Sequence, residues 1–172
     1  MKRLFDLLYH HLENSPLDNF LNAREASGKW TAYSSKQVLE LVEKTAAGLV
    51  HLGLQPGDKV ALVSYKNRPE WVIMDYAIQM AGLISIPLYP TISSGEYEYI
   101  MNEAEVKAAF CGGMDLIDKL TEAQKNIPTL KHIFTFERHA KADYWESIWN
   151  TTEHEEVKKR KNSIHESDLV TI

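Results

Sequence analysis

The chain has 172 residues, of which 44% are hydrophobic, 25% charged and 10% aromatic, and its formal net charge is −5. These values are typical of one globular domain and argue against a disordered, collagen-like or coiled-coil chain. The acidic balance argues against a nucleic-acid partner, because such binding depends on clustered Lys and Arg. A single cysteine, Cys111, excludes an internal disulfide and favours a reducing compartment, so we expect a cytoplasmic protein.

The longest apolar stretches do not have the features of export or membrane segments. The apolar residues after Met1-Lys2-Arg3 are interrupted by Asp6, unlike those of a signal peptide. The stretch from Val72 to Leu88 contains Asp75 and falls short of the ~20 clean apolar residues that a spanning helix needs. We therefore expect no transmembrane segment.

Residues 1–33 predict a leading helix and a hairpin. Leucines recur at helical spacing at Leu4, Leu8 and Leu12, until Asn14-Ser15-Pro16 ends the pattern. Between residues 26 and 33, a Ser-Gly turn signal precedes β-prone residues, which favours a short strand or hairpin.

Residues 34–136 predict alternating helices and strands. Helix starts are indicated by two capping boxes and by a capping-type Asn followed by Pro: Ser34 to Gln37, Ser93 to Glu96 and Asn67 to Glu70. Strands are indicated by short β-rich apolar runs: Lys59 to Ser64, Leu83 to Leu88, Lys107 to Cys111 and His132 to Phe136. Short links between these elements predict an α/β fold, a mainly parallel sheet with right-handed crossovers and helices on both faces.

Residues 137–172 predict a helical connection into a strand. Trp145 and Trp149 lie four residues apart in a short predicted helix, which favours a packing face over an aromatic cage. Lys158 to Lys161 follows several glutamates at helical spacing, and we interpret it as a solvated face with internal ion pairs. Asp168 to Ile172 is predicted to be a strand, whose uncovered edge would favour self-association.

Motifs for common catalytic chemistries do not occur. There is no Gly-x-x-x-x-Gly-Lys, Gly-x-Gly-x-x-Gly or Gly-x-Ser-x-Gly, and His154-Glu155 lacks the second histidine of a zinc-protease helix. Gly112-Gly113 favours a turn over a phosphate loop. Cys111, with no basic neighbour in sequence, is predicted to be a buried structural thiol. We assign no catalytic residue and no metal ligand.

Several blocks nevertheless resemble one family, the AMP-forming acyl-activating ligases. The blocks are Trp30-Thr31-Ala32-Tyr33, Gly53 to Ala61, Asn67-Arg68-Pro69-Glu70-Trp71, Ala81-Gly82 and Pro87-Leu88-Tyr89-Pro90-Thr91. The Gly-Leu-x-Pro-Gly-Asp part of the second block is similar throughout the superfamily, including the peptide-synthetase adenylation domains. The third and fifth blocks resemble the long-chain fatty acid–CoA ligases, because amino acid adenylation domains tend towards Pro-Leu-Asp-Pro at the fifth. Cys111-Gly112-Gly113 departs mildly from the family, in which a Val-Ser type ending is commoner.

The resemblance implies a fold and a reaction for a longer protein. The fold is the N-terminal subdomain of an acyl-CoA synthetase, residues 1–172 being truncated before the Thr/Ser/Gly-rich loop that grips the ATP phosphates. A carboxylate would attack the α-phosphate of ATP to give an acyl-adenylate and pyrophosphate, and the CoA thiol would then displace AMP. The magnesium-binding Glu, the ribose-binding Asp and the Lys of a mobile C-terminal domain would lie outside this chain. ATP, CoA and Mg²⁺ would serve the full-length enzyme, and we expect none of them to bind these 172 residues alone.

Substrate-binding candidates come from the two motifs that follow predicted strands. They are Asn67, Arg68, Pro69, Glu70, Trp71, Tyr89, Pro90 and Thr91. Open α/β sheets place ligands at the carboxyl ends of their strands, which is where both groups are expected. The plainer interpretation is a helix start with a packing Trp for the first group and a rigid turn for the second, and it stays open.

The leading hypothesis is the N-terminal portion of a long-chain fatty acid–CoA ligase, inactive by itself. Fatty acid, ATP and CoA would be the partners of the full-length enzyme, with peripheral contact at the inner membrane face as an open question. One alternative is an adenylate-forming ligase for another carboxylic acid. The other is a free-standing, non-catalytic α/β binding module that ends at Ile172. The sequence indicates neither chain-length preference nor oligomeric state.

Overall fold

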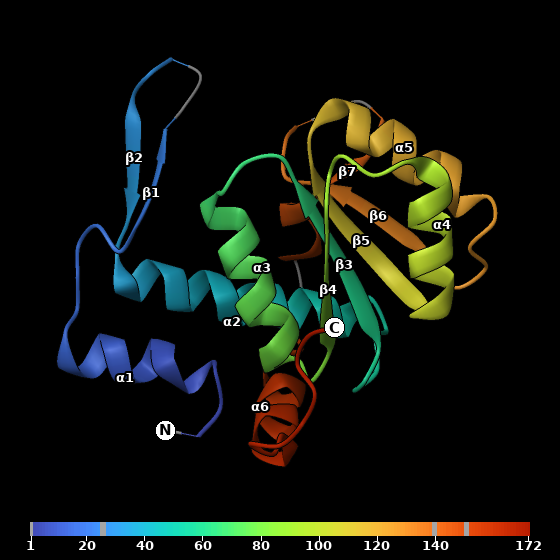
Figure 1. The fold of residues 1–172 in the computed structure, drawn as a ribbon. Helices are drawn as coiled ribbons and strands as arrows, with labels where there is room; N and C mark the ends of the chain where they lie inside the picture. Colours follow the sequence, from blue (N-terminus) through green and yellow to red (C-terminus); the bar gives the residue numbers. More distant parts are fainter. Residues whose placement is uncertain (1, 25–26, 139–140, 150–151) are drawn as a thin grey trace.

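A computed structural model describes the chain except for residues 1, 25–26, 139–140 and 150–151 (Figure 1). Its helices are α1 (Asp6–Asn14), α2 (Ser35–His51), α3 (Pro69–Met80), α4 (Ser94–Glu103), α5 (Met114–Gln124), the 3₁₀ helix η1 (Trp145–Trp149) and α6 (His154–Ser163). Its strands are β1 (Leu21–Arg24), β2 (Trp30–Tyr33), β3 (Lys59–Ser64), β4 (Ile84–Leu88), β5 (Val106–Gly112), β6 (His132–Thr135) and β7 (Asp143–Tyr144). The alternation predicted from sequence is confirmed over residues 34–136.

The main sheet has five parallel strands in the order β4-β3-β5-β6-β7. The strands β1 and β2 form a separate antiparallel hairpin. β3 lies between two partners and is nearly continuous in apolar residues, as expected of a strand covered on both faces. The predicted parallel α/β class is therefore confirmed.

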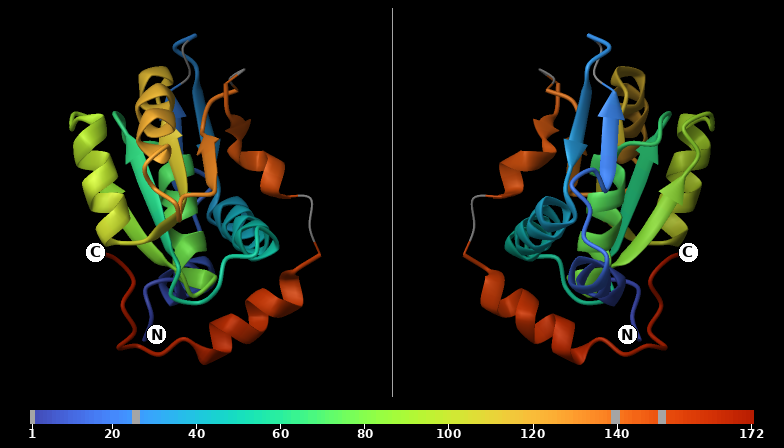
Figure 2. Two further views of the ribbon diagram at one scale, coloured as in Figure 1. Left: turned by 90° about the vertical axis from the view of Figure 1, so that its right-hand side faces the viewer. Right: turned by 90° about the vertical axis from the view of Figure 1, so that its left-hand side faces the viewer.

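Two apolar cores lie on opposite faces of this sheet, and Figure 2 shows α2 and α4 on opposite sides of it. Side chains alternate between faces along a strand, so Val60 and Leu62 enter the core shared with α2 and α3. Ala61 and Val63 enter the core shared with α4 and α5. Helices on both faces, as predicted, follow from this two-sided burial.

The observed helix starts show which of the predicted capping signals are formed in the structure. The capping boxes at Ser34 and Ser93 are both formed, each with reciprocal side-chain and backbone hydrogen bonds. The expected capping role of Asn67 is wrong, because the N-cap of α3 is Arg68, without a side-chain cap. Pro69 stands at the first helical turn, where its missing N–H leaves no hydrogen bond unmade.

The C-terminal residues form a single bridge where a strand was predicted. Thr171 pairs in parallel with Ser85, whose N–H donates to Val170 O at 2.9 Å and whose carbonyl accepts from Ile172 N–H at 3.1 Å. N–H groups alternate in direction along a strand, so residue 87 of β4 also faces this outer edge. It is Pro87, which has no N–H to donate, and the next rung of the ladder is therefore missing.

The basic segment of α6 is a solvated face with internal ion pairs only in part. Lys158 and Lys159 are exposed, and Glu156 pairs with Lys159 at 3.7 Å, as predicted, but Arg160 is buried. Arg160 is only 7% exposed, and its guanidinium donates to Leu54 O at 2.8 Å and Ala81 O at 3.4 Å. Leu54 lies in the loop after α2, and Ala81 is the C-cap of α3. Arg160 therefore joins α6 to both helices, and Glu156 supplies its counter-charge at 3.3 Å.

The predicted Trp packing face is confirmed. Trp145 and Trp149 meet edge to face with ring centroids 4.9 Å apart, and Trp145 is buried. The indole N–H of Trp149 donates to Thr45 Oγ1 at 3.0 Å, which fixes η1 on α2.

Candidate functional site at the carboxyl edge of the sheet

The carboxyl ends of β3, β4, β5 and β6 all lie at one edge of the sheet, because these strands are parallel (Figure 1). From β3 the chain passes through α3 to β4 on one side, whereas from β5 it passes through α5 to β6 on the other. The connections thus diverge between the neighbouring strands β3 and β5. Such a switch point is where open α/β sheets usually bind ligands.

Arg68 joins the loops at this switch point. Its guanidinium contacts Glu70 through two hydrogen bonds of 3.0 and 3.1 Å, Glu137 at 3.2 Å and the carbonyl of Phe136 at 3.3 Å. The side chains of Arg68 and Glu70 are each 19% exposed, so this pair is well shielded from water. Burial lowers the pKa of Arg68, but hydrogen bonds and charges from the two glutamates more than offset this and raise it.

Gly112 leaves the space that Arg68 occupies. A Cβ at this position would lie 2.6 Å from Arg68 Nη1 and 2.9 Å from Ser64 Oγ. The next residue, Gly113, has a φ of 143°, which strongly favours glycine. Both glycines therefore have steric and backbone roles, which supports the turn interpretation of this pair.

A cleft of about 1010 Å³ opens between the β1–β2 hairpin and the loop from β3 to α3. We call it the hairpin cleft; its lining residues are Asn22, Ala23, Arg24, Gly28, Trp30, Thr31, Tyr33, Lys66, Asn67, Arg68, Pro69, Glu70 and Glu137. Four of the first group of substrate-binding candidates, Asn67 to Glu70, thus share one cleft. Trp71, the fifth, is partly buried against the core of α2 and α3, in agreement with the packing interpretation.

The second group of candidates lies on a different loop and does not line the hairpin cleft. The carbonyl of Tyr89 accepts a hydrogen bond from the Tyr97 hydroxyl at 2.9 Å. The carbonyl of Pro90 accepts one from Lys119 Nζ at 3.2 Å, and Thr91 follows in the same turn. The backbone of this loop is therefore fixed to α4 and α5, whereas the Tyr89 side chain is 79% exposed.

Large exposed side chains follow three neighbouring strands. Tyr65 after β3, Tyr89 after β4 and Met114 after β5 are 49%, 79% and 63% exposed. The Tyr65 hydroxyl donates to Asp115 at 2.5 Å, and this hydrogen bond raises the pKa of Tyr65. Met114 and Asp115 were not among the sequence candidates. The signal that could have found them is their position just after a buried strand and its Gly-Gly turn.

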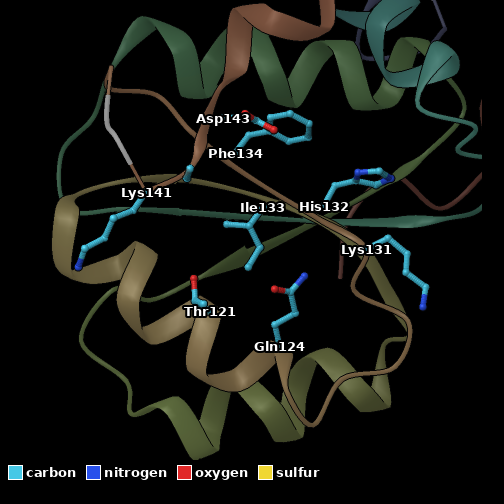
Figure 3. A pocket seen from close by; sticks show the side chains of 9 residues that line it. Thr121, Gln124, Lys131, His132, Ile133, Phe134, Lys141 and Asp143 are labelled. Atoms are coloured by element: carbon cyan, nitrogen blue, oxygen red, sulfur yellow. The ribbon is translucent and has the colours of Figure 1, made fainter.

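A second pocket, of about 510 Å³, lies between α5 and the strands β6 and β7 (Figure 3). Thr121 and Gln124 come from α5, and His132 and Ile133 from the first half of β6. That half is open because β7 pairs only with Phe134 and Thr135. No predicted site residue lines this pocket.

Cys111 is fully buried at the end of β5, and burial raises the pKa of its thiol to about 12. A thiol with such a pKa is poorly nucleophilic near neutrality, so the prediction of a structural cysteine is confirmed. In the part of the chain that the structure describes, no three His, Cys, Asp or Glu side chains gather as a metal site. Among the same residues, no helix is long and apolar enough to cross a membrane.

Comparisons with known proteins give the family. A family model described as AMP-binding enzyme matches residues 10–172. The chain is 27% identical over 127 residues to the long-chain-fatty-acid–CoA ligase FadD15 of Mycobacterium bovis, covering 74% of this chain and 21% of that protein. It is 32% identical over 136 residues to long chain acyl-CoA synthetase 3 of Arabidopsis thaliana, covering 77% and 20%.

Solved structures show the same fold. The fatty acyl CoA synthetase of Mycobacterium tuberculosis aligns with a TM-score of 0.70 at 21% identity, covering 89% of this chain and 29% of that one. The anthranilate CoA ligase AuaEII, in complex with anthranoyl-AMP, aligns with a TM-score of 0.70 at 19% identity, covering 87% and 27%. The chain spans about a fifth of the length of the curated relatives it matches. With the family model covering nearly all of its residues, the chain belongs to the AMP-binding enzyme family.

Proposed function

We propose that this chain is the N-terminal portion of a long-chain fatty acid–CoA ligase. The complete enzyme activates a fatty acid with ATP and transfers the acyl group to CoA. The observation that carries this proposal is the family match over residues 10–172, together with curated relatives of 27% to 32% identity that are named for long-chain fatty acids.

In this proposal the chain supplies walls of the site and no catalytic group. The carboxylate oxygen bonds to the α-phosphorus of ATP as the bond to pyrophosphate breaks, and the CoA sulfur then bonds to the acyl carbon as AMP leaves. Such steps depend on positioned charges more than on a protein nucleophile. The loops at Asn67 to Glu70 and Tyr89 to Thr91 lie at the ligand edge of the sheet, and Arg68 fixes the first of them to the end of β6.

Magnesium is part of the proposed reaction but is assigned to no residue of this chain. Magnesium at nucleotide sites is usually held by one or two carboxylates together with the phosphates. The family resemblance assigns its protein ligand to a Glu outside residues 1–172. We therefore place its ligands in the portion of the enzyme that lies outside residues 1–172, and propose that this portion also holds the ATP phosphates. A cytoplasmic location is proposed from the single cysteine, and peripheral contact at the inner membrane face is an open alternative based on the family resemblance.

The test is fatty-acid-dependent ATP–pyrophosphate exchange, measured on the longer protein and on the 172-residue chain. We expect exchange and acyl-CoA formation from the longer protein and neither from the short chain. A panel of long-chain, medium-chain, aromatic and amino acids separates the long-chain enzyme from the alternative of a ligase for another acid. A gene that stops after codon 172 would contradict the proposal and favour a binding module.

The role of the edge loops is tested with two exposed tyrosines. Tyr89 is 79% exposed at the carboxyl edge, and Tyr99 is 68% exposed on α4. Because neither ring is packed, both alanine variants should keep the melting temperature of the longer protein. Tyr89→Ala should lower kcat/KM about tenfold if the ring contacts a substrate, and Tyr99→Ala should not. Equal activities of the two variants would contradict a binding role for Tyr89.

A further inference from the structure

Three polar side chains meet between α3 and the edge strand β4, which pack against each other (Figure 1). Asp75 and Gln79 lie four residues apart on α3 and therefore share one face of the helix. Ser85 stands on β4 between Ile84 and Ile86, which pack on the side of α4 and α5, so the Ser85 side chain points the other way, towards α3. Gln79 is 6% exposed and Ser85 is fully buried. Polar groups thus occupy a place where apolar side chains would normally pack.

The carboxyl group of Asp75 is partly buried without a counter-charge. Burial raises its pKa, and the polar contacts with Ser85 and Gln79 offset this only in part. In the part of the chain that the structure describes, no Lys, Arg or His side chain forms an ion pair with Asp75. Burial, and then the charge of Asp75, raise the pKa of the neighbouring Tyr76. An ionised carboxylate at this depth is costly unless a positive charge accompanies it.

The amide of Gln79 leaves a second oxygen beside this carboxylate. Its Nε2 donates to Asp75 Oδ2 at 2.9 Å. An ionised carboxylate only accepts hydrogen bonds, so turning the amide over would set two acceptors against each other. Gln79 Oε1 is attached to the same carbon as Nε2, is buried, and has no hydrogen-bond partner among the described residues. A buried acceptor without a partner costs free energy, which indicates that a further group completes this cluster.

The hydroxyl of Ser85 supplies a third oxygen. It lies close enough to Asp75 to affect the pKa of that carboxyl, but Oγ is buried and makes no hydrogen bond of normal geometry with a described residue. The backbone of Ser85 is used elsewhere, since its N–H and C=O pair with Val170 and Ile172. Carboxylate, amide and hydroxyl oxygens from two elements are therefore gathered at one place.

We propose that Asp75, Gln79 and Ser85 bind one monovalent alkali cation, Na⁺ or K⁺. Hard cations take oxygen ligands of these three kinds. One carboxylate supplies one negative charge, which a monovalent ion neutralises, whereas a divalent ion would leave an excess positive charge in a largely buried site. Because Asp75 is partly exposed, the ion can enter from solvent and keep water among its ligands.

The proposed cation joins α3 to the outer strand of the sheet. Ser85 is the second residue of β4, so the site lies towards the start of this strand and away from the loops at the carboxyl edge. At the same residue β4 pairs with Thr171, so the ion also supports the segment that adds to this edge. The site does not depend on the proposed ligase activity.

Thermal unfolding at constant ionic strength tests the site, since screening is then equal in every salt. The 172-residue chain and the longer protein are each heated in NaCl, KCl or tetramethylammonium chloride, whose bulky methyl groups prevent coordination by the cluster. We expect a melting temperature higher by roughly 3–6 °C in one alkali salt, once the ion is about tenfold above its dissociation constant. Equal melting temperatures in all three salts would overturn the site and leave water as the occupant. A shift in the short chain alone would overturn it for the longer protein, whose own donor then fills the cluster.

Substitutions locate the ion. Asp75→Asn removes the charge and Gln79→Met removes an oxygen at similar volume, so both should abolish the difference between salts. Asp118→Asn makes the same charge change at an acid on α5 that pairs with Lys141, and it should keep the difference. If Asp75→Asn does not fold, Gln79→Met and the broadening of the sodium NMR signal by the unsubstituted protein decide. A salt effect that persists in the cluster variants would place the ion elsewhere and contradict the proposal. Because ligase activity is not measured, its absence would leave this inference standing.

Discussion

Gly48 lies in the fourth turn of α2, where alanine would normally be preferred, and the structure predicts that Gly48→Ala destabilises the protein. A Cβ at this position would lie 2.5 Å from Ile148 Cγ1 and 2.6 Å from the carbonyl oxygen of Ile148. The first of these atoms belongs to a side chain that can turn. The second belongs to the backbone of η1, so the substitution forces η1 away from α2.

Two opposing effects decide the size of the change. Replacing an internal helical glycine by alanine stabilises a helix by about 1 kcal/mol. Overpacking a filled site costs typically about 1–3 kcal/mol, and contact with a backbone carbonyl places this site at the upper end. We therefore expect a net loss of about 1–2 kcal/mol, which corresponds to a melting temperature lower by roughly 2–8 °C for a chain of this size.

Gly95→Ala provides the matched control. Gly95 lies in the first turn of α4, and a Cβ there would have no atom within 4 Å. The same substitution should stabilise the protein by up to about 0.5–1 kcal/mol, because only the helix preference changes. Urea and thermal unfolding of both variants give the comparison, and the fluorescence of Trp145 and Trp149 reports displacement of η1. A Gly48→Ala protein as stable as Gly95→Ala, with unchanged fluorescence, would refute the reasoning.

Three further predictions concern single side chains. Arg68→Gln leaves the shielded Glu70 without its cation and should lower the free energy of unfolding in urea by about 2–3 kcal/mol. Adding Glu70→Gln should recover part of this loss, and a double variant as unstable as the single one would contradict the pairing. Ser34→Ala removes the reciprocal capping bonds of α2 and should cost about 1 kcal/mol, whereas no change in the unfolding midpoint would show that the cap is not needed. Cys111 should resist iodoacetamide in the native protein and react once urea unfolds it, since burial raises the pKa of its thiol to about 12, and rapid native labelling would contradict the burial. Because the folded state disfavours the thiolate, stability should fall as pH rises from 9.0, the ordinary pKa of the thiol, towards 12, and it should fall less in Cys111→Ala.

Elements whose signals lie close together in the sequence were predicted correctly, whereas the candidate site, which combines distant segments, was predicted only in part. The strand Lys59–Ser64 and the capping boxes at Ser34 and Ser93 were predicted correctly because their signals lie within a few neighbouring residues. The candidate site was predicted in part. Asn67 to Glu70 do lie together in one cleft, but the hairpin that forms its other wall comes from residues some 40 positions earlier.

The features that were missed depend on contacts between distant residues. Arg160 looked like part of a solvated face, but its partners are carbonyl groups 79 and 106 positions away in the sequence. Arg68 pairs with Glu137 across 69 positions, and no periodicity indicates such a pair. The predicted C-terminal strand forms one bridge because, on either side of Ser85, the Leu83 N–H donates to Ile78 O and Pro87 has no N–H.

Over residues 34–136 the sequence by itself determined the elements, their order and their buried faces, because capping, turn residues and apolar periodicity act over one or two turns of chain. Tertiary structure decided the strand order β4-β3-β5-β6-β7, the exclusion of a side chain at Gly48 and the shielding of Arg68. These depend on which surfaces pack together, and packing is set by shape and charge across the whole fold. A residue's neighbours in space carry that information, and its neighbours in sequence do not.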